Sequence, residues 1–483
     1  MVQYLFKNSK PIEHHKHPEG GNVEKGKQLV ASAGCLGCHA VGDWKGAQQG
    51  PQLDGMGSKL NKDWLYTWLK NPKHVWADTR MPSLRLTDEE VRDITSYLMS
   101  LKNEKWEKVP VPSVSQETLD QVALEYLVIQ HGEILGKEKL MSMTLEEKKL
   151  FVGERAINRY GCFACHTISG FEKASKIGTE LTEEGSKDVH SFDFGFEPIE
   201  ETRQAWLFQK LKDPRVFDRG RVKTREEKLR MPHFSFTDEE AEALTTFLLS
   251  LKKSEVPESL TKQLSEKERA IEKGRRMVRD WNCQGCHSIE GKGGLIAQTL
   301  EPGMAPPPLE GEGEKVWGDW LHQFLKEPTP IRPWLTVRMP TFGFTDEQAT
   351  SFVRYFEELS DQKLTYKAKE IPHPTQEQWE TGKHLFDALK CIQCHRGELA
   401  PGMSASDLAP DLALAQDRLK PRWIIKWLVD PDKLMPGTKM PGFFPDLQSP
   451  LPNILDGDAK AQIKALRDYI IHFNQEEYQQ SGK

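Results

Sequence analysis

The chain has 483 residues, a net charge of -6, 29% charged residues and 37% hydrophobic residues, and its mean hydropathy is -0.62. This length suits three or four domains, and interspersed charges of both signs argue against nucleic acid as a partner. No apolar run approaches the roughly 18 to 20 residues of a membrane-spanning helix, and residues 1–10 lack the apolar core of a secretory signal. The composition predicts a soluble chain that is poor in core-forming side chains.

The first element of a repeated pattern is a short amphipathic stretch that follows a glycine. A glycine stands nine residues before a cysteine at four places, Gly26, Gly153, Gly274 and Gly382. The apolar residues between glycine and cysteine fit one face of a helix. Such self-similarity predicts a chain built from repeated modules.

A Cys-x-x-Cys-His motif completes each stretch, and the four copies use all eight cysteines. They are Cys35/Cys38/His39, Cys162/Cys165/His166, Cys283/Cys286/His287 and Cys391/Cys394/His395. Two thiols at this spacing add to the vinyl groups of a c-type haem, and the histidine becomes the proximal ligand of the iron. Disulfides are the alternative for paired cysteines outside the cytoplasm, but a histidine after every pair favours haem. The sequence predicts four covalently attached haem c groups.

The next element is a predicted helix that runs from a tryptophan to a proline eight residues later, since proline cannot continue a helix. The four copies are Trp64 to Pro72, Trp206 to Pro214, Trp320 to Pro328 and Trp423 to Pro431.

A basic residue followed by Met-Pro comes after each of these helices. The methionines are Met81, Met231, Met339 and Met440. A thioether sulfur opposite the proximal histidine is a suitable sixth ligand of haem iron and raises its reduction potential, whereas core packing is the usual role of methionine. Met435-Pro436 is a rival in the fourth copy, but the nine-residue gap from Pro431, equal to that from Pro72 to Met81, favours Met440.

A last helix closes each repeat. In three copies a Thr-x-x-Glu/Gln box predicts its start, because the threonine caps the helix while the acid or amide reaches back. The boxes are Thr87 to Glu90, Thr237 to Glu240 and Thr345 to Gln348. The fourth copy lacks the box, and its last helix is predicted to begin near Asp456 or Asp458.

In this order of elements, each repeat resembles a class I cytochrome c domain. The resemblance implies an all-α fold of four tandem cytochrome c-like domains, each a small helical bundle around one covalent haem. We call the predicted domains modules 1 to 4. The expected division is an N-terminal tail (1–24), module 1 (25–103), a linker with a helix (104–151), module 2 (152–253), a linker (254–270), module 3 (271–360), a linker (361–378), module 4 (379–475) and a C-terminal tail (476–483).

The resemblance also implies that a proline after each motif helps to hold the proximal histidine. Matching positions are Pro51 in module 1, Pro308 in module 3 and Pro410 in module 4. Module 2 departs from the pattern with Gly178-Thr179-Glu180-Leu181, so the surroundings of His166 are expected to differ.

Three segments fall outside the repeat. His14, His15 and His17 suggest either a metal site or a solvated tail. Module 2 has a basic insertion that is expected to dock an acidic partner, pair with haem propionates or form a solvated loop. Its basic residues are Arg215, Arg219, Arg221, Lys223, Arg225, Lys228 and Arg230. The aromatic segment 192–196 is expected to contact another module or subunit.

Irons with both axial positions filled leave no site for substrate, so the ligand set predicts an electron carrier without catalytic residues. The expected role is the c-type subunit of a membrane respiratory, quinol-oxidising complex related to the bc complexes, with cytochrome b and iron-sulfur subunits as partners. A free periplasmic or extracellular shuttle is one alternative. A haem peroxidase or reductase with a displaceable methionine, best placed in module 2, is another, and a sensor ranks lower. Haem attachment predicts an extracytoplasmic location in a bacterium, with an export leader either removed or encoded upstream.

Overall fold

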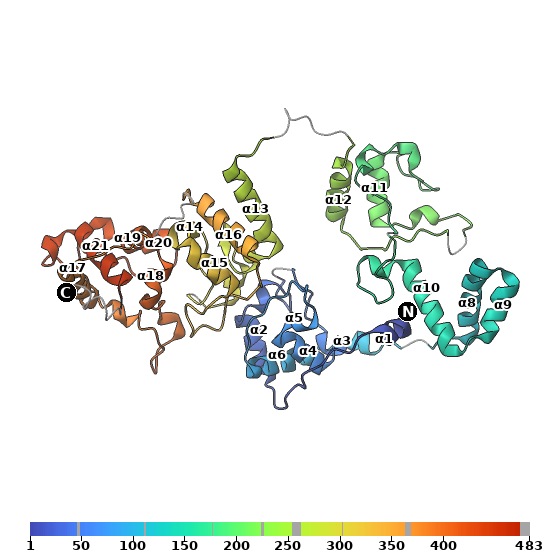
Figure 1. Ribbon diagram of the computed structural model, residues 1–483, viewed down its shortest axis with the longest axis horizontal. Helices are drawn as coiled ribbons and strands as arrows, with labels where there is room; N and C mark the ends of the chain where they lie inside the picture. Colours follow the sequence, from blue (N-terminus) through green and yellow to red (C-terminus); the bar gives the residue numbers. More distant parts are fainter. Residues whose placement is uncertain are drawn as a thin grey trace. The chain divides into compact units, whose positions relative to one another are not determined.

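A computed structural model describes residues 1–45, 49–110, 113–175, 177–223, 227–253, 262–301, 303–362 and 369–473. The chain divides into two compact units, one of residues 1–11 and 110–263 and the other of residues 12–109 and 264–483. We call them unit 1, which holds module 2, and unit 2, which holds modules 1, 3 and 4 (Figure 1). Arg225, much of linkers 254–270 and 361–378, and the tail 476–483 lie outside the described residues. The domain boundaries drawn from the sequence stay a prediction.

Helices make up most of both units, which confirms the predicted all-α fold. Within the described residues the strands form one hairpin, in which β1 (Ser288–Ile289) pairs with β2 (Lys292–Gly293).

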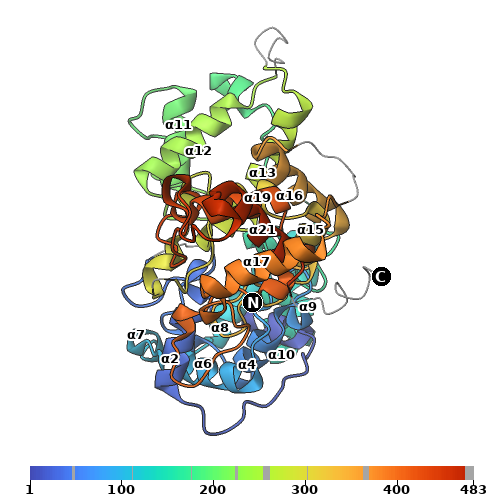
Figure 2. The same ribbon diagram turned by 90° about the vertical axis from the view of Figure 1, so that its left-hand side faces the viewer.

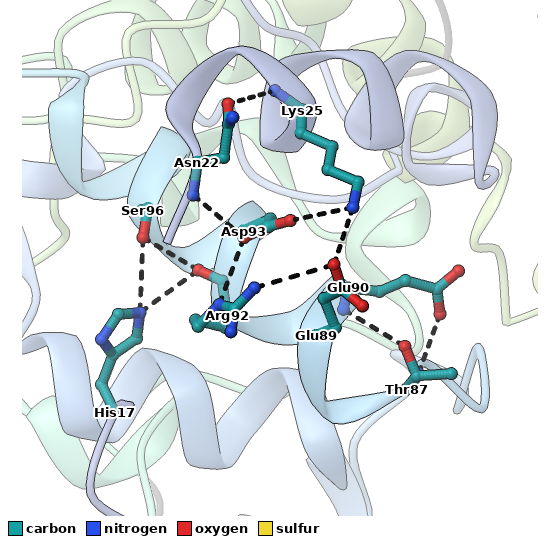
Figure 3. A network of polar contacts seen from close by, with 9 residues as sticks. All are labelled: His17, Asn22, Lys25, Thr87, Glu89, Glu90, Arg92, Asp93 and Ser96. Carbon is teal, nitrogen blue, oxygen red and sulfur yellow. Dashed lines mark hydrogen bonds and ion pairs between the residues drawn. The ribbon is translucent and has the colours of Figure 1, made fainter. Parts of the chain in front are cut away.

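Module 1 is closed by its first and last helices, α2 (Val23–Ser32) and α6 (Asp88–Ser100), which pack on each other. A Cβ atom on Gly26 would lie 2.0 Å from the Asp93 carbonyl oxygen, so only glycine allows this close crossing. The Asp93 side chain is 1% exposed and accepts the Asn22 backbone N–H at 2.9 Å (Figure 3). Between the two helices lie α3 (Met56–Lys59), α4 (Lys62–Lys70) and α5 (Pro72–Val75).

Modules 3 and 4 repeat this arrangement within unit 2. In module 3, α13 (Glu266–Asp280) packs on α16 (Asp346–Leu359), and α15 (Gly318–Lys326) packs on α16 (Figure 2). In module 4, α17 (Gln376–Ala388) and α19 (Pro421–Val429) pack on α21 (Ala459–Ile471). The remaining helices of the two modules are α14 (Glu312–Lys315), α18 (Ala415–Arg418) and α20 (Pro431–Leu434).

Unit 1 departs from this plan. The first helix of module 2, α10 (Leu145–Tyr160), packs on α8 (Gln116–His131) and on α1 (Val2–Asn8). A Cβ atom on Gly153 would lie 3.1 Å from Tyr4 Cβ, so the glycine of the repeat faces α1 here. The last helix, α12 (Asp238–Ser250), packs on α11 (Arg203–Lys212). The predicted linker also contains α8 and α9 (Glu133–Ser142), which pack on each other in unit 1, and α7 (Glu104–Glu107), which belongs to unit 2.

All three predicted capping boxes are confirmed, at the starts of α6, α12 and α16. In module 4 the last helix begins at Ala459 with Asp458 as its N-cap, also as predicted.

Candidate haem-binding sites

Each Cys-x-x-Cys-His motif folds into one short turn of 3-10 helix that follows the first helix of its module. The turns are Cys35–Gly37, Cys162–Ala164, Cys283–Gly285 and Cys391–Gln393. In every copy the histidine N–H donates to the carbonyl oxygen of the first cysteine, at 2.9 to 3.1 Å. All eight cysteines are free thiols, so the motifs keep their sulfur atoms available for thioether bonds.

In modules 1, 3 and 4 a proline carbonyl lies beside the imidazole of the motif histidine. His39 Nδ1 is 2.8 Å from the Pro51 oxygen, His287 Nδ1 is 2.6 Å from the Pro307 oxygen and His395 Nδ1 is 2.7 Å from the Pro410 oxygen. A protonated Nδ1 that donates to a carbonyl fixes the ring and leaves Nε2 as the ligand atom. In module 3 the acceptor is Pro307 and not Pro308, because the oxygen precedes the leucine by two residues in all three modules.

Module 2 lacks this contact. Thr179 stands where the other modules have their acceptor proline. The His166 side chain is exposed, and its ring makes no hydrogen bond within the described part of unit 1. The motif turn therefore places His166, but no hydrogen bond from a described residue orients its ring.

One cavity of about 1160 Å³ in unit 2 brings together the predicted site residues of modules 1, 3 and 4. Its walls include Cys35, Cys38, His39, Met81, Cys283, Cys286, His287, Met339, Cys391, Cys394, His395 and Met440. A cavity this large exceeds the usual range of a single ligand pocket. Thiols, imidazoles and thioethers therefore line a mostly apolar space that suits a large planar group in each module. The site residues of module 2 belong to unit 1.

Cys165 of module 2 is exposed, as is Cys394 of module 4, whereas the other six motif cysteines are half-buried. Cys162 and Cys165 belong to unit 1 and are not part of the cavity described for unit 2. The first helix of module 2, α10, packs on α1 and α8, whereas the first helix of each other module crosses its last helix. The attachment of Cys162 and Cys165 to haem stays a prediction.

Desolvation in the cavity of unit 2 changes the proton affinities of its groups. Burial raises the pKa of Cys35 and of Cys283 to about 12 and that of Cys391 to about 11, so these thiols stay neutral. Burial also lowers the pKa of His39 and of His287, although the proline carbonyls oppose this shift. Neutral imidazole is the form that binds a metal, and neutral thiols are poor at disulfide exchange.

Each module of unit 2 also brings its predicted methionine and its first motif cysteine to one apolar core. Met81 and Cys35 pack against the core of module 1, Met339 and Cys283 against that of module 3, and Met440 and Cys391 against that of module 4. Met435 lines the cavity but does not belong to the core of module 4. This placement favours Met440 as the ligand.

A tryptophan donates to the methionine sulfur in two modules, a contact that the sequence analysis missed. Trp68 Nε1 lies 2.9 Å from Met81 Sδ, and Trp427 Nε1 lies 2.8 Å from Met440 Sδ. Both donors stand four residues after the tryptophan that all four repeats share, where module 3 has Phe324 and module 2 has Lys210. The repeated Trp-x-x-x-Trp spacing was the available signal, since residues four apart share a helix face.

Met231 in module 2 is half-buried and has no such partner among the described residues. Lys210 instead donates to the Pro214 carbonyl at 3.1 Å, and desolvation lowers its pKa. The shared Trp206 stacks on Phe217, with ring centroids 5.6 Å apart.

The basic insertion of module 2 is largely engaged within its own module. Arg221 makes two hydrogen bonds of 2.6 Å to the Asp193 carboxylate, and Lys223 binds Asp218 at 2.8 Å. Phe192 of the aromatic segment packs on Trp206, with ring centroids 4.6 Å apart, and is 6% exposed. Phe192 therefore packs within its own module, whereas Phe196 of the same segment is 73% exposed, and the expected contact with another module or subunit stays a prediction.

Of the three histidines near the N-terminus, His17 packs on module 1, whereas His14 and His15 are exposed. The His17 N–H donates to Asp63 at 2.9 Å, and His17 Nε2 lies 3.2 Å from the Arg92 carbonyl oxygen (Figure 3). No cluster of three or more His, Cys, Asp or Glu that would hold a metal ion occurs among the described residues.

Comparison with known proteins bears on two of the modules. Residues 23–102 and 271–360 match the cytochrome c family model. Modules 1 and 3 are therefore similar to cytochrome c domains. A further match is 33% identical over 96 residues to cytochrome c oxidase subunit 2 of Bacillus sp. (strain PS3), and it covers 17% of this chain and 27% of that protein. The chain thus spans only about a quarter of the length of that relative. No solved structure matches the chain.

Domains of the cytochrome c family carry covalently bound haem c and transfer electrons. The residues present in modules 1 and 3 fit this group, because two free thiols, an oriented imidazole and a thioether line the same cavity. Within the residues that the structure describes, no helix is both long and apolar enough to cross a bilayer.

Proposed function

We propose that the chain is a tetrahaem electron carrier with one haem c in each module. The observation that carries this proposal is the cavity of unit 2, where three modules present the same set of two thiols, one imidazole and one thioether. Module 2 repeats the motif turn and the Met-Pro sequence. Bound haem c supplies a one-electron couple between ferrous and ferric iron.

The residues of the chain would hold and tune that group. The cysteines would attach it, the histidines would bind its iron through Nε2, and the methionines Met81, Met231, Met339 and Met440 would supply a sulfur ligand. The proline carbonyls fix the imidazoles. The apolar cores exclude water, and burial together with a Met/His ligand pair favours a raised reduction potential.

Haem counting tests the proposal. The mass of the intact purified chain should correspond to four covalent haem groups, and peptide mapping should find one on each motif. Changing Cys162 and Cys165 of the exposed motif to serine should remove one haem and leave three. A wild-type chain with fewer than four covalent haems would contradict the tetrahaem proposal.

We further propose that the chain is the c-type subunit of a membrane respiratory complex, on the periplasmic or extracytoplasmic face of a bacterial membrane. The matched relative is named as a subunit of cytochrome c oxidase, which supports a place in a respiratory assembly. The class of complex that we favour is a quinol-oxidising, bc-like assembly with cytochrome b and iron-sulfur subunits.

Mild detergent extraction of native membranes, native electrophoresis and haem staining test this second step. Co-migration with a cytochrome b or an iron-sulfur subunit is the expected result. Co-migration with terminal oxidase subunits would instead place the chain at the oxidase. Recovery of the chain alone in the soluble fraction would favour a free shuttle or wire.

Module 2 supports a second candidate function, that of a haem peroxidase or reductase with a displaceable methionine. The observation in its favour is that both predicted iron ligands of module 2 lack a hydrogen-bond partner found in other modules. Within the described residues of unit 1, His166 has no carbonyl partner and Met231 has no indole donor. Rapid binding of carbon monoxide to one reduced haem of the wild-type chain would favour this function. Its loss in the Cys162→Ser and Cys165→Ser variant, which lacks the haem of module 2, would assign the reaction to that module, and no binding to any haem would exclude this function.

A further inference from the structure

The haem motifs of modules 1 and 3 lie back to back, although more than two hundred residues separate them in the sequence. A Cβ atom on Gly37 would lie 2.6 Å from Cys286 Sγ, and a Cβ atom on Gly285 would lie 2.1 Å from the Gly37 carbonyl oxygen. Neither position tolerates a side chain without separation of the two motifs. Gly37 and Gly285 occupy the same place in their motifs, directly before the second cysteine.

The sequence distinguishes these two motifs from the others at this place. Module 2 has Ala164 and module 4 has Gln393 where modules 1 and 3 have glycine. Because the motif turn forms in all four modules, it does not itself require glycine. The close approach of the two motifs does require it.

Asn282, which precedes the motif of module 3, fastens the two motifs together. Its Nδ2 donates to the Gly37 carbonyl oxygen at 2.9 Å and lies 3.3 Å from Cys38 Sγ. A side chain of module 3 therefore contacts a sulfur atom that would carry the haem of module 1.

The Met-Pro loops of the two modules pair with the same symmetry. Ser83 and Thr341, each two residues after the predicted methionine ligand, exchange two backbone hydrogen bonds of 3.0 and 2.8 Å. Equivalent residues that contact each other across an interface are the mark of a two-fold pair. The haem motifs and the methionine loops of both modules thus meet their counterparts.

Two arginines donate hydrogen bonds across the interface between modules 1 and 3. Arg85 Nη2 donates to the Met339 carbonyl oxygen at 2.8 Å. In the other direction, Arg338 donates to the Arg85 carbonyl oxygen at 3.0 Å and to the Glu90 carboxylate at 2.5 Å. The Arg338 and Glu90 side chains are 23% and 18% exposed, so this ion pair is largely shielded from water.

We propose that modules 1 and 3 form a two-fold dihaem pair in which Gly37, Gly285 and Asn282 hold the two attachment motifs in contact. Within unit 2, module 3 thus lies next to module 1, although module 2 stands between them in the sequence. Exchange within the pair moves one electron from a ferrous to a ferric iron and changes no bond. This inference rests on the proposed function.

Circular dichroism in the Soret region of the full-length, haem-loaded chain tests the pairing, because two haem chromophores in contact give a couplet of opposite signs. The wild-type chain should show the couplet. Gly285→Gln introduces the side chain that module 4 carries at the same place, and it should reduce the couplet at least twofold while all haems stay attached. Ala164→Gln makes a matched change in module 2 and should leave the couplet unchanged.

A wild-type chain without a couplet, or a Gly285→Gln chain that keeps the full couplet, would overturn the pairing. The haem count of each peptide separates this failure from that of the proposed function, which requires a haem on Cys35 and on Cys283 in the wild-type chain.

A cross-link tests the interface without a change to either motif. The Ser83 and Thr341 Cα atoms form a hydrogen-bonded antiparallel pair, which puts them about 5.5 Å apart and within the range of a disulfide. The double variant Ser83→Cys with Thr341→Cys should form an internal disulfide in the haem-loaded chain. Ser83→Cys with Gly442→Cys, which uses the equivalent position of module 4, should not. Equal cross-linking in the two variants, or none in the first, would contradict the pairing.

Discussion

The indole N–H of Trp68 points at the sulfur of Met81, with 2.9 Å between Nε1 and Sδ. Trp427 and Met440 repeat this contact at 2.8 Å. In the same position module 3 has Phe324, which stacks on Trp320 and has no N–H to offer. Modules 1 and 4 thus have an indole donor beside the predicted methionine ligand, whereas module 3 has a phenyl ring at that position.

Changing Trp68 to Phe should lower the reduction potential of the haem in module 1. A donated hydrogen bond draws electron density from the sulfur and disfavours ferric iron, so its loss stabilises the oxidised state. A hydrogen bond of about 1 kcal/mol corresponds to roughly 40 mV for a one-electron couple. A spectroelectrochemical titration should resolve one component that shifts downward.

The matched control for this prediction is Phe324→Trp, which supplies the missing donor in module 3. Its expected effect is an upward shift of similar size in one component. If both variants titrate like the wild-type chain, the indole contact has no influence on the iron.

The two neighbouring methionines of module 4 should respond differently to substitution. Met440 packs against the core of its module under Trp427, whereas Met435 only lines the cavity. Met440→Ala should therefore abolish one sulfur-to-iron charge-transfer contribution in the oxidised spectrum and open one haem to carbon monoxide. Met435→Ala should keep the full spectrum, and the reverse outcome would make Met435 the ligand.

The repeated motifs revealed nearly all of the secondary structure that builds the sites, because capping boxes and proline stops act locally. The carbonyl partner of His287 was predicted one residue late, at Pro308. Pro307 and Pro308 are adjacent, and only the spacing of two residues to the following leucine, as in modules 1 and 4, distinguishes them. The pairing of module 1 with module 3 was not predicted at all. It depends on Gly37 and Gly285, which have no distinctive local role and matter only when they meet.

In module 2, too, the motif does not predict the contacts between distant segments. Its motif blocks match those of its neighbours, but α10 packs on α1, from the far end of unit 1, instead of crossing a last helix as in modules 1, 3 and 4. A glycine at a helix crossing marks a close approach without specifying the partner, and at Gly153 that partner is Tyr4. Contacts of this kind between distant segments carry no periodic signal in the sequence.

Protection of the insertion in module 2 should depend on acid pH. The hydrogen bonds from Arg221 hold the pKa of Asp193 below its ordinary value of 3.8, against the opposing effect of burial. Because the folded-state pKa is the lower one, the stabilisation is fully present above pH 3.8 and is lost as the pH falls through the depressed value.

Hydrogen-exchange protection of residues 190–222, measured against pH, checks this prediction. Protection in the wild-type chain should decrease below about pH 4, the ordinary range of an aspartate. Asp193→Asn should have lower protection at neutral pH and a flatter profile. An identical profile in the two chains would mean that the carboxylate does not hold the insertion.

Glu90 serves two purposes, since it closes the capping box of α6 and accepts Arg338 from module 3. Glu90→Gln separates them. Glutamine still closes such a box, as Gln348 does at α16, but it removes the charge and leaves a largely buried arginine without its counterion. We expect a loss of about 1 to 2 kcal/mol in the docking of modules 1 and 3. Amide exchange at Ser83 and Thr341 should accelerate roughly 5- to 30-fold.

Glu240→Gln is the matched control, because Glu240 closes the equivalent box at α12 in unit 1. This variant should leave exchange at Ser83 and Thr341 unchanged. Equal acceleration in both variants would point to a general loss of helix stability, whereas acceleration in Glu90→Gln alone assigns the effect to Arg338. Since Ser83 and Thr341 are the residues whose backbones join the two Met-Pro loops, the same measurement reports directly on the interface that holds the two haem motifs together.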